Sequence, residues 1–252
     1  MGFGDALIAS GIARKARQKH PDRPICIGTG SEIEWNEVFD GNPNISREVV
    51  PGAVWVHSYK SFRPYVDYAK TTTEKFVWKK DFKTSQGEIY LREDERRWTL
   101  SGFVYIEPNI KGWCGPNKDW GFDRWQEVVD TLPDVKFVQG PGRKLNNVVQ
   151  VETESFRDAC ALLDRADLFV GTDGGLHHAA AALDKPAVVV WGGFTHPRNL
   201  GYEEHINLHS GVEPCGNIKA CKHCEKAMNQ IRPTKVVEAI RKSLGRLRTD
   251  PH

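Results

Sequence analysis

The chain has 252 residues, of which 39% are hydrophobic and 27% charged, with 8 Trp and 11 Phe. This length leaves room for two small lobes, and this composition excludes a disordered, collagen-like or coiled-coil protein. The 35 Lys and Arg residues nearly balance the 33 Asp and Glu residues, which excludes a broad basic surface for nucleic acid or anionic membranes, so any polyanion site must be local.

The first hundred residues predict half of a Rossmann-like lobe. Residues 5–19 have helical character and end at His20-Pro21, because the residue before a proline avoids helical backbone. Residues 25–27 and 54–59 have the composition of strands. The charged stretch 91–97 is the best linker candidate.

From residue 103 onward, short apolar runs alternate with segments of helical period, which indicates an α/β fold with a parallel sheet and crossover helices. The run 187–191 is apolar throughout, so we expect a strand buried on both faces and central in its sheet. The last helix is expected to pack back on the fold. The predicted strands are 103–107, 135–139, 168–171 and 187–191, and the predicted helices are 122–132, 155–165, 176–183 and 235–247.

The longest apolar stretch is far below the ~20 residues that a transmembrane helix needs. The start lacks a basic segment followed by an apolar core, which a secretory signal would show. Six cysteines are too few for a disulfide scaffold of this size. These features predict a cytoplasmic protein without a transmembrane segment, at most peripheral at the inner membrane face.

The most informative run is Asp173-Gly174-Gly175-Leu176-His177-His178, which joins a predicted strand to an Ala-rich helix. The glycines leave space for a ligand, and the free N–H groups of the first helical turn form a site for a diphosphate. Such ligands lie beyond the carboxyl ends of the strands in open α/β sheets. A Gly-Gly turn is also ordinary loop chemistry, but the polar Asp173 and His178 on either side of it favour a binding site.

This run resembles the hallmark of glycosyltransferase family 9, the heptosyltransferase-like group with the GT-B fold. The family motif Asp-Thr-Gly-x-x-His, followed by Ala-Ala-Leu and a Lys-Pro strand, corresponds here to residues 173–178, 180–183 and 185–192, with Gly174 in place of Thr. Two further segments are similar to the family: Gly4-Asp5-Ala6-Leu7 at the first helix, and Asn117-Lys118-Asp119-Trp120.

The resemblance implies two Rossmann-like lobes of GT-B type, over residues 1–97 on the acceptor side and 98–252 on the nucleotide-sugar side. The N-terminal lobe is expected to be reduced, because the short apolar strand that precedes the Gly-Asp loop in the family is missing here. The resemblance also implies that Asp5 is the catalytic base. The implied donor-binding residues are Lys118, Asp173, Gly174, Gly175, Leu176, His178 and Thr195.

The implied activity is transfer of a sugar from a nucleotide diphosphate donor to a glycan or other hydroxyl acceptor, inverting and without an obligatory metal. ADP-heptose is the first expectation for the donor, with lipopolysaccharide biosynthesis as the setting. Taken alone, Asp5 could be an N-cap and Lys118 a solvated lysine. A non-catalytic module that binds nucleotides or single-stranded nucleic acid is the alternative from another class, although no nucleic acid is expected. A nucleotide-sugar epimerase is a second enzyme-class alternative.

A cysteine cluster, Cys215-x5-Cys221-x2-Cys224, offers three candidate thiolate ligands for a structural Zn or Fe ion. His223 and His209 lie near enough in sequence to be fourth ligands. One Cys-x2-Cys pair with a third cysteine is a weaker signal than two such pairs. A reduced structural cluster and a disulfide therefore stay open.

Overall fold

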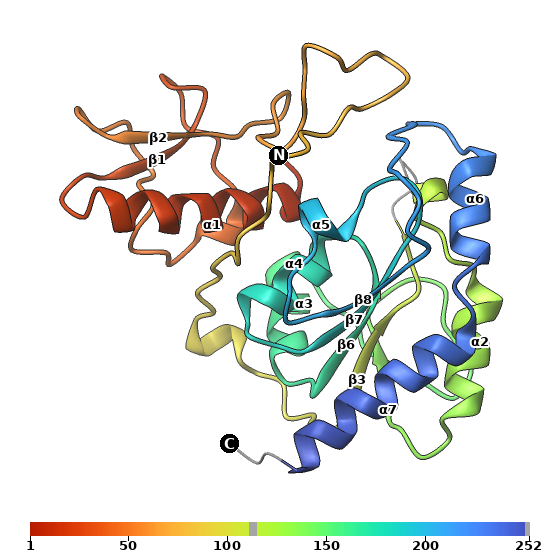
Figure 1. Ribbon diagram of the computed structural model, residues 1–252. Helices are drawn as coiled ribbons and strands as arrows, with labels where there is room; N and C mark the ends of the chain where they lie inside the picture. The colour runs from red at the N-terminus through yellow and green to blue at the C-terminus, as the bar shows by residue number, and fades with distance from the viewer. Residues whose placement is uncertain (111–114, 250–252) are drawn as a thin grey trace.

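The computed structural model describes residues 1–110 and 115–249, which form two α/β parts that lie against each other (Figure 1). In the N-terminal part, two parallel strands pair from Ile25 opposite Val54 to Gly28 opposite His57, and one long helix covers them. Leu7 and Ile8 of that helix are buried in one core with Ile25 and Val56 of the strands. The elements are α1 (Phe3–Lys19), β1 (Ile25–Gly28), η1 (Glu37–Phe39), β2 (Val54–His57) and η2 (Glu93–Glu95).

The C-terminal part is built on six parallel strands in the order β5-β4-β3-β6-β7-β8. The strands are β3 (Val104–Glu107), β4 (Phe137–Gln139), β5 (Val149–Gln150), β6 (Leu168–Thr172), β7 (Ala187–Trp191) and β8 (Ile206–His209). The helices are η3 (Gly115–Asn117), α2 (Phe122–Thr131), α3 (Phe156–Asp164), α4 (Gly175–Ala182), α5 (Pro197–Leu200), α6 (Lys222–Asn229) and α7 (Pro233–Thr249).

Successive residues of β7 point to opposite faces of the sheet, because side chains alternate along a strand. Val188 and Val190 belong to the core beneath α2 and α7, whereas Val189 and Trp191 belong to the core beneath α3 and α4. The second core continues through α1 to the strands of the N-terminal part. One apolar core therefore crosses from one part of the chain to the other.

The α/β class with parallel sheets is confirmed, and each helix and strand predicted above is present, most with ends displaced by one or two residues. The predicted strand 187–191 is buried throughout, but it is not central, because β8 pairs outside it and β3 and β6 occupy the middle of the sheet. The last helix, α7, packs on β6, β7, β8 and α2. Among the described residues, no helix is both long and apolar enough to cross a bilayer.

Two glycines bring α1 against α4. A Cβ atom on Gly4 would lie 3.0 Å from His178 Cδ2 and 3.6 Å from the Gly175 Cα atom. The missing side chain thus lets the first turn of α1 touch the first turn of α4. This contact places Asp5 beside the glycine turn that follows β6.

Buried Arg157 on α3 links the C-terminal part to the N-terminal part by hydrogen bonds. Its guanidinium donates to both carboxylate oxygens of Glu95, at 2.6 and 2.7 Å, and to the backbone carbonyls of Glu37, Asp40 and Tyr90. Such bidentate pairs fix orientation as well as distance. The arrangement of the two parts around the cleft between them is therefore specified by directed contacts.

Candidate active site

A cleft of about 770 Å³ lies between the two parts, at the carboxyl ends of β3 and β6. Ligands of open parallel sheets bind at this edge. The structure brings all eight residues that were expected to form the catalytic and donor sites to the lining of this one cleft. They are Asp5, Lys118, Asp173, Gly174, Gly175, Leu176, His178 and Thr195.

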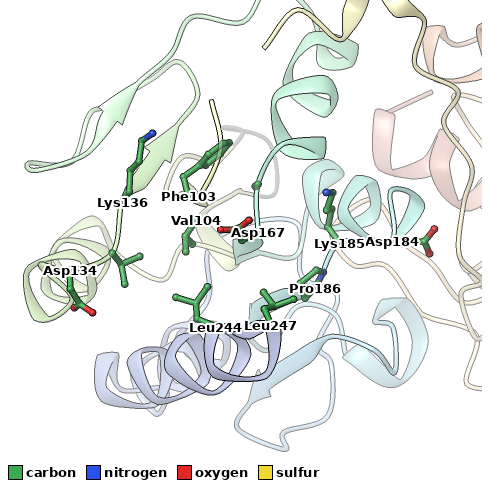
Figure 2. Close-up of a pocket in the computed structure, with 13 residues that line it drawn as sticks. Phe103, Val104, Asp134, Lys136, Asp167, Asp184, Lys185, Pro186, Leu244 and Leu247 are labelled. Atoms are coloured by element: carbon green, nitrogen blue, oxygen red, sulfur yellow. The ribbon is translucent and has the colours of Figure 1, made fainter. Parts of the chain in front are cut away.

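A second cavity, of about 500 Å³, lies at the opposite end of the strands (Figure 2). Its walls include Phe103 and Asp167, which precede β3 and β6, and Leu244 of α7. None of the predicted site residues lines it. It is therefore the weaker candidate for a nucleotide site.

Asp5 is the third residue of α1 rather than its N-cap, which is Gly2. Its carboxylate oxygens point to other elements instead: Oδ1 accepts a hydrogen bond from the Tyr65 hydroxyl at 2.5 Å, and Oδ2 accepts from Arg63 Nε at 3.1 Å. Burial, together with the Asp5 charge, raises the pKa of Tyr65 well above its ordinary value. Tyr65 therefore stays a hydrogen-bond donor to Asp5 at any physiological pH.

Asp173, at the carboxyl end of β6, forms a buried ion pair with Lys118. Its Oδ2 atom lies 2.7 Å from Lys118 Nζ and accepts a hydrogen bond from Thr195 Oγ1 at 2.6 Å. Burial opposes the charged form, but the positive charge of Lys118 holds the pKa of Asp173 well below its ordinary value. The carboxylate is therefore ionised, and it orients Lys118 and Thr195 at the cleft wall.

The turn at Gly174 presents backbone donors to the cleft. His177 Nε2 lies 3.2 Å from the Leu200 carbonyl, to which it must donate, so Nδ1 of the neutral ring accepts from the Gly174 amide at 3.2 Å. Among the described residues, the amides of Gly175 and Leu176 have no acceptor, as expected in the first turn of a helix. Both residues line the cleft.

The two histidines of the motif are both buried. His177, which was expected on the helix surface or in packing, is fully buried and packs edge-on against Trp191. His178 Nδ1 lies 2.8 Å from the Tyr202 hydroxyl. Burial lowers the pKa of both rings, that of His178 strongly. They are neutral at physiological pH and contribute hydrogen bonds rather than charge.

The low pKa of buried His205, which lies near these histidines, predicts that the protein loses stability in acid. Burial lowers its pKa from 6.5 to about 3, while in the unfolded chain it titrates at its ordinary value. A depressed histidine pKa means that the unfolded chain binds more protons, so stability is lost as pH falls below 6.5, by about 2 kcal/mol at pH 5. We expect denaturant unfolding at pH 7.5 and pH 5 to show that His205→Gln no longer has this pH-dependent part of the free energy of unfolding. The variant of exposed His20, His20→Gln, should keep it, and equal pH dependence in wild type and His205→Gln would contradict the assignment.

The aromatic and basic run of residues 55–65 has a composition that suits an acceptor cleft or a surface for single-stranded nucleic acid, and of its members Arg63 and Tyr65 line the cleft. Other cleft residues were not singled out from the sequence. Phe76 and Trp78 line the cleft from the same part of the chain. Glu107 ends β3 at the cleft, where burial raises its pKa to about 7, although the Asn109 amide opposes this. No spacing in the sequence marks these positions.

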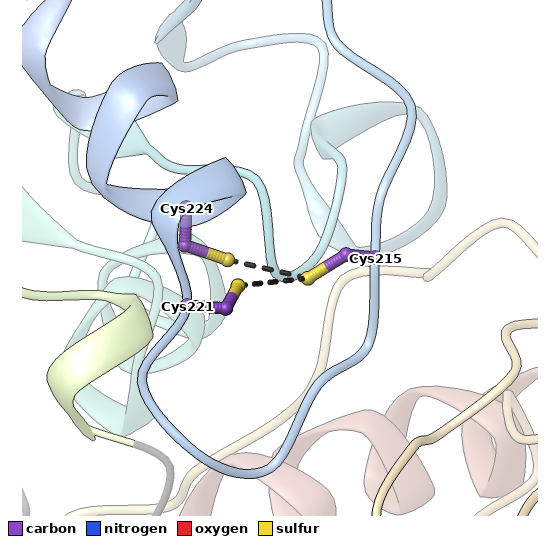
Figure 3. Close-up of side chains that lie close together, drawn as sticks. All are labelled: Cys215, Cys221 and Cys224. Carbon is purple, nitrogen blue, oxygen red and sulfur yellow. Dashed lines mark hydrogen bonds between the residues drawn. The ribbon is translucent and has the colours of Figure 1, made fainter.

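The three thiols of the predicted cluster converge (Figure 3). Cys215 Sγ lies 3.3 Å from Cys224 Sγ and 3.8 Å from Cys221 Sγ, and the three sulfur atoms lie within 4.8 Å of one another. This cluster could hold a metal ion. His223 and His209 do not join the group: His223 Nε2 contacts the Glu213 carbonyl at 2.9 Å and His209 Nδ1 accepts from the Gly211 amide at 3.2 Å.

Asp173, His177 and His178 also place their ligand atoms within 4.8 Å of one another. The carboxylate is paired with Lys118, however, and both ring nitrogens of His177 face backbone groups. The three cysteines are therefore the better metal ligands, since thiolates select zinc and iron.

Comparison with known proteins gives a family match in the C-terminal part. The model of glycosyltransferase family 9 (heptosyltransferase) matches residues 145–232. No curated protein matches the chain.

Three solved structures show how far the fold is shared. A family 9 glycosyltransferase from Veillonella parvula superposes with a TM-score of 0.69 and 16% identity, over 97% of this chain and 95% of that one. TibC of enterotoxigenic E. coli, an iron-containing dodecameric glycosyltransferase, gives 0.66 and 14%, over 98% and 74%. ADP-heptose lps heptosyltransferase II of E. coli gives 0.50 and 18%, over 73% and 59%.

The chain spans 59% of that heptosyltransferase II and 45% of the E. coli heptosyltransferase WaaC. At these identities, the structural likeness concerns the fold. The model of glycosyltransferase family 9 thus matches residues 145–232, and the fold is shared with a family 9 glycosyltransferase over nearly the whole chain.

Proposed function

We propose that the protein transfers a sugar from a nucleoside diphosphate donor to a hydroxyl group of a glycan or other acceptor, with inversion at the sugar carbon. The observation that carries this proposal is that Asp5 of the N-terminal part and Lys118 with the Gly174 turn of the C-terminal part line one cleft. ADP-heptose is the first candidate donor, because it appears in the name of the structurally similar heptosyltransferase II.

In the proposed mechanism, Asp5 accepts the proton of the attacking acceptor hydroxyl. Each carboxylate oxygen already takes one hydrogen bond, from Tyr65 or from Arg63. Since a carboxylate offers about four acceptor sites, lone pairs remain for the acceptor hydroxyl. A carboxylate suffices as a base when proton transfer is late in an oxocarbenium-like transition state.

The departing diphosphate would meet donors from the opposite wall. Gly175 and Leu176 begin α4 and line the cleft, so we expect their amides and the positive end of the α4 dipole to be available to a ligand there. Lys118 gives one N–H to Asp173 and retains two for phosphate oxygens. These groups supply charge stabilisation at the position where the negative charge develops, so the proposal places no metal at the reacting atoms.

Residues 1–97 would supply the acceptor side and residues 98–252 the nucleotide-sugar side, as two Rossmann-like lobes of GT-B type. The setting proposed is lipopolysaccharide biosynthesis in the cytoplasm, peripheral at the inner membrane face. A structural zinc or iron ion would occupy Cys215, Cys221 and Cys224, apart from the chemistry.

Ligand-dependent unfolding tests the nucleotide site. Because a ligand stabilises the folded state by RT ln(1 + [L]/Kd), the matching diphosphate at ~100 Kd should add about 2.7 kcal/mol. We expect ADP to raise the midpoint of thermal unfolding more than UDP or GDP, and single-stranded oligonucleotides to leave it unchanged. A response to oligonucleotide alone would favour the non-catalytic binding module. Interconversion of the donor sugar without any acceptor would favour an epimerase.

A further inference from the structure

The segment 215–224, called here the cysteine loop, touches three separate walls of the cleft. Its first contact is with the segment that leads to Thr195. The Cys215 amide donates to the Gly193 carbonyl at 2.7 Å, and the Gly216 amide donates to the Phe194 carbonyl at 3.2 Å. The loop thus holds the backbone immediately before Thr195, whose hydroxyl bonds Asp173.

The second contact is with the segment that carries Lys118. The side chain of Asn117, only 1% exposed, donates to the backbone carbonyls of Asn217 at 2.5 Å and Lys219 at 2.8 Å. Its Oδ1 atom accepts from the Cys221 amide at 3.0 Å. All hydrogen-bonding groups of this buried amide except one lone pair are thereby directed at the cysteine loop.

The third contact reaches the N-terminal part. The Phe76 amide donates to the Gly216 carbonyl and the Ile218 amide donates to the Glu74 carbonyl, both at 2.9 Å. Gly216 has φ +67°, and a Cβ atom there would lie 1.9 Å from the Phe76 carbonyl oxygen, so only glycine allows this approach. Phe76 and Trp78 also line the cleft.

The three thiols close the cysteine loop on itself. Cys215 begins the loop, while Cys221 and Cys224 lie at the start of α6 (Figure 3). Residues 216–220 contain no helix or strand of their own, apart from one isolated bridge at Asn217. The conformation of the loop therefore depends on its contacts with the three segments and on what joins its ends. Three converging thiolates suit a thiophilic divalent cation such as Zn²⁺ or Fe²⁺.

We propose that a thiophilic divalent cation bound by Cys215, Cys221 and Cys224 holds the three cleft walls in their nucleotide-binding arrangement, so that metal occupancy raises the affinity of the cleft for a nucleoside diphosphate. The inference rests on the nucleotide site proposed above. The coupling is reciprocal, because linkage requires ADP to tighten metal binding by the same factor.

The test compares ADP affinity with metal content in the whole protein. Wild type is purified, analysed for Zn and Fe, stripped with a chelator and reloaded with Zn²⁺, and ADP is titrated into each form by calorimetry. We expect the stripped form to bind ADP about tenfold more weakly, within the usual range of such couplings. Reloading should restore the affinity. Far-UV circular dichroism checks that the stripped protein is folded.

Two variants separate the metal from the coupling. Cys221→Ser should lose both metal and ADP affinity, whereas Cys26→Ser, at a buried cysteine of β1, should keep both. Asn117→Ala leaves the thiols intact but removes the link to Lys118. This variant should therefore retain the metal and still lose ADP affinity.

Three results would overturn the inference. Equal ADP affinity in stripped and loaded protein removes the coupling and leaves the nucleotide site standing. Less than a tenth of an equivalent of metal, both as purified and after Zn²⁺ addition, removes the metal. ADP binding in none of the forms, with metal bound, overturns this inference together with the proposed function.

Discussion

Replacing Asp5 by asparagine is expected to reduce sugar transfer by a factor of ~10²–10⁴, the usual contribution of a general base. The amide cannot take the proton of the acceptor hydroxyl at neutral pH. Binding of the nucleoside diphosphate should change little, because the proposed donors to the phosphates belong to the other part of the chain. Asp5→Ala should lower transfer in the same way.

The fold of this variant should survive, because an asparagine can serve both partners of Asp5. Its oxygen can accept from Arg63 Nε while its NH₂ group donates to the Tyr65 oxygen, in place of the two bonds that the carboxylate accepts. The ion pair that is lost is partly solvated, with the two side chains 13% and 21% exposed. We expect its removal to lower stability by about 1 kcal/mol.

The measurement has two arms: ADP affinity by calorimetry, and ADP release from ADP-heptose with an acceptor glycan. Asp67→Asn is the matched control, because Asp67 pairs with Lys70 at the surface of the same part and is absent from the cleft lining. The control should keep both activities. Unchanged turnover in Asp5→Asn would remove Asp5 from the mechanism.

Much of the C-terminal part could be predicted because its strands are short apolar runs. The strand 187–191 has the same bounds in the structure, since no polar residue interrupts it and both faces are buried. Strand β8 was not predicted, because it has only four residues, two of them polar, at a half-buried sheet edge. Strand β5 has only two residues, and α6 is rich in charged residues, so neither gives a clear pattern.

The candidate site was predictable only as far as the motifs reach. The turn at Gly174 follows an apolar strand, so its place at the carboxyl edge of the sheet follows from local sequence. The positions of the two partners of Asp5 do not follow from local sequence. Tyr65 and Arg63 lie in a segment without regular helices or strands, and their positions depend on tertiary contacts such as the packing of Tyr65 on Trp78 and Phe82. The roles of the predicted residues stay predictions until the variants are measured.

Replacing Lys118 by methionine is expected to have the largest effect on stability. The Lys118 side chain is 24% exposed, but its partner Asp173 is only 5% exposed, so the variant leaves a buried carboxylate without its cation. Breaking a buried pair on one side typically costs about 3–5 kcal/mol. For a chain of this size, the midpoint of thermal unfolding should fall by roughly 10 °C.

Lys185→Met is the matched control for this variant. Lys185 is also 24% exposed, but it lies 3.9 Å from Asp164, which is 21% exposed and can be solvated. Its removal should cost no more than about 1 kcal/mol. A comparable loss in both variants would mean that burial of Asp173 does not control the outcome.

The pH dependence of Lys118→Met separates a lost charge pair from lost packing. In the wild type, the pKa of Asp173 is depressed, so its contribution to stability is present above the ordinary pKa of 3.8 and is lost as pH falls below that value. Without Lys118, burial raises the pKa of the Asp173 carboxyl, and the stability of the variant should instead recover as pH falls toward this raised pKa.

The double variant Lys118→Met/Asp173→Asn should regain much of the lost stability at neutral pH, because no buried charge remains. Denaturant unfolding of Lys118→Met, Lys185→Met and the double variant between pH 4.5 and 7.5 measures these free energies of unfolding. A double variant that is as unstable as Lys118→Met would show that lost packing, not the unpaired charge, is responsible.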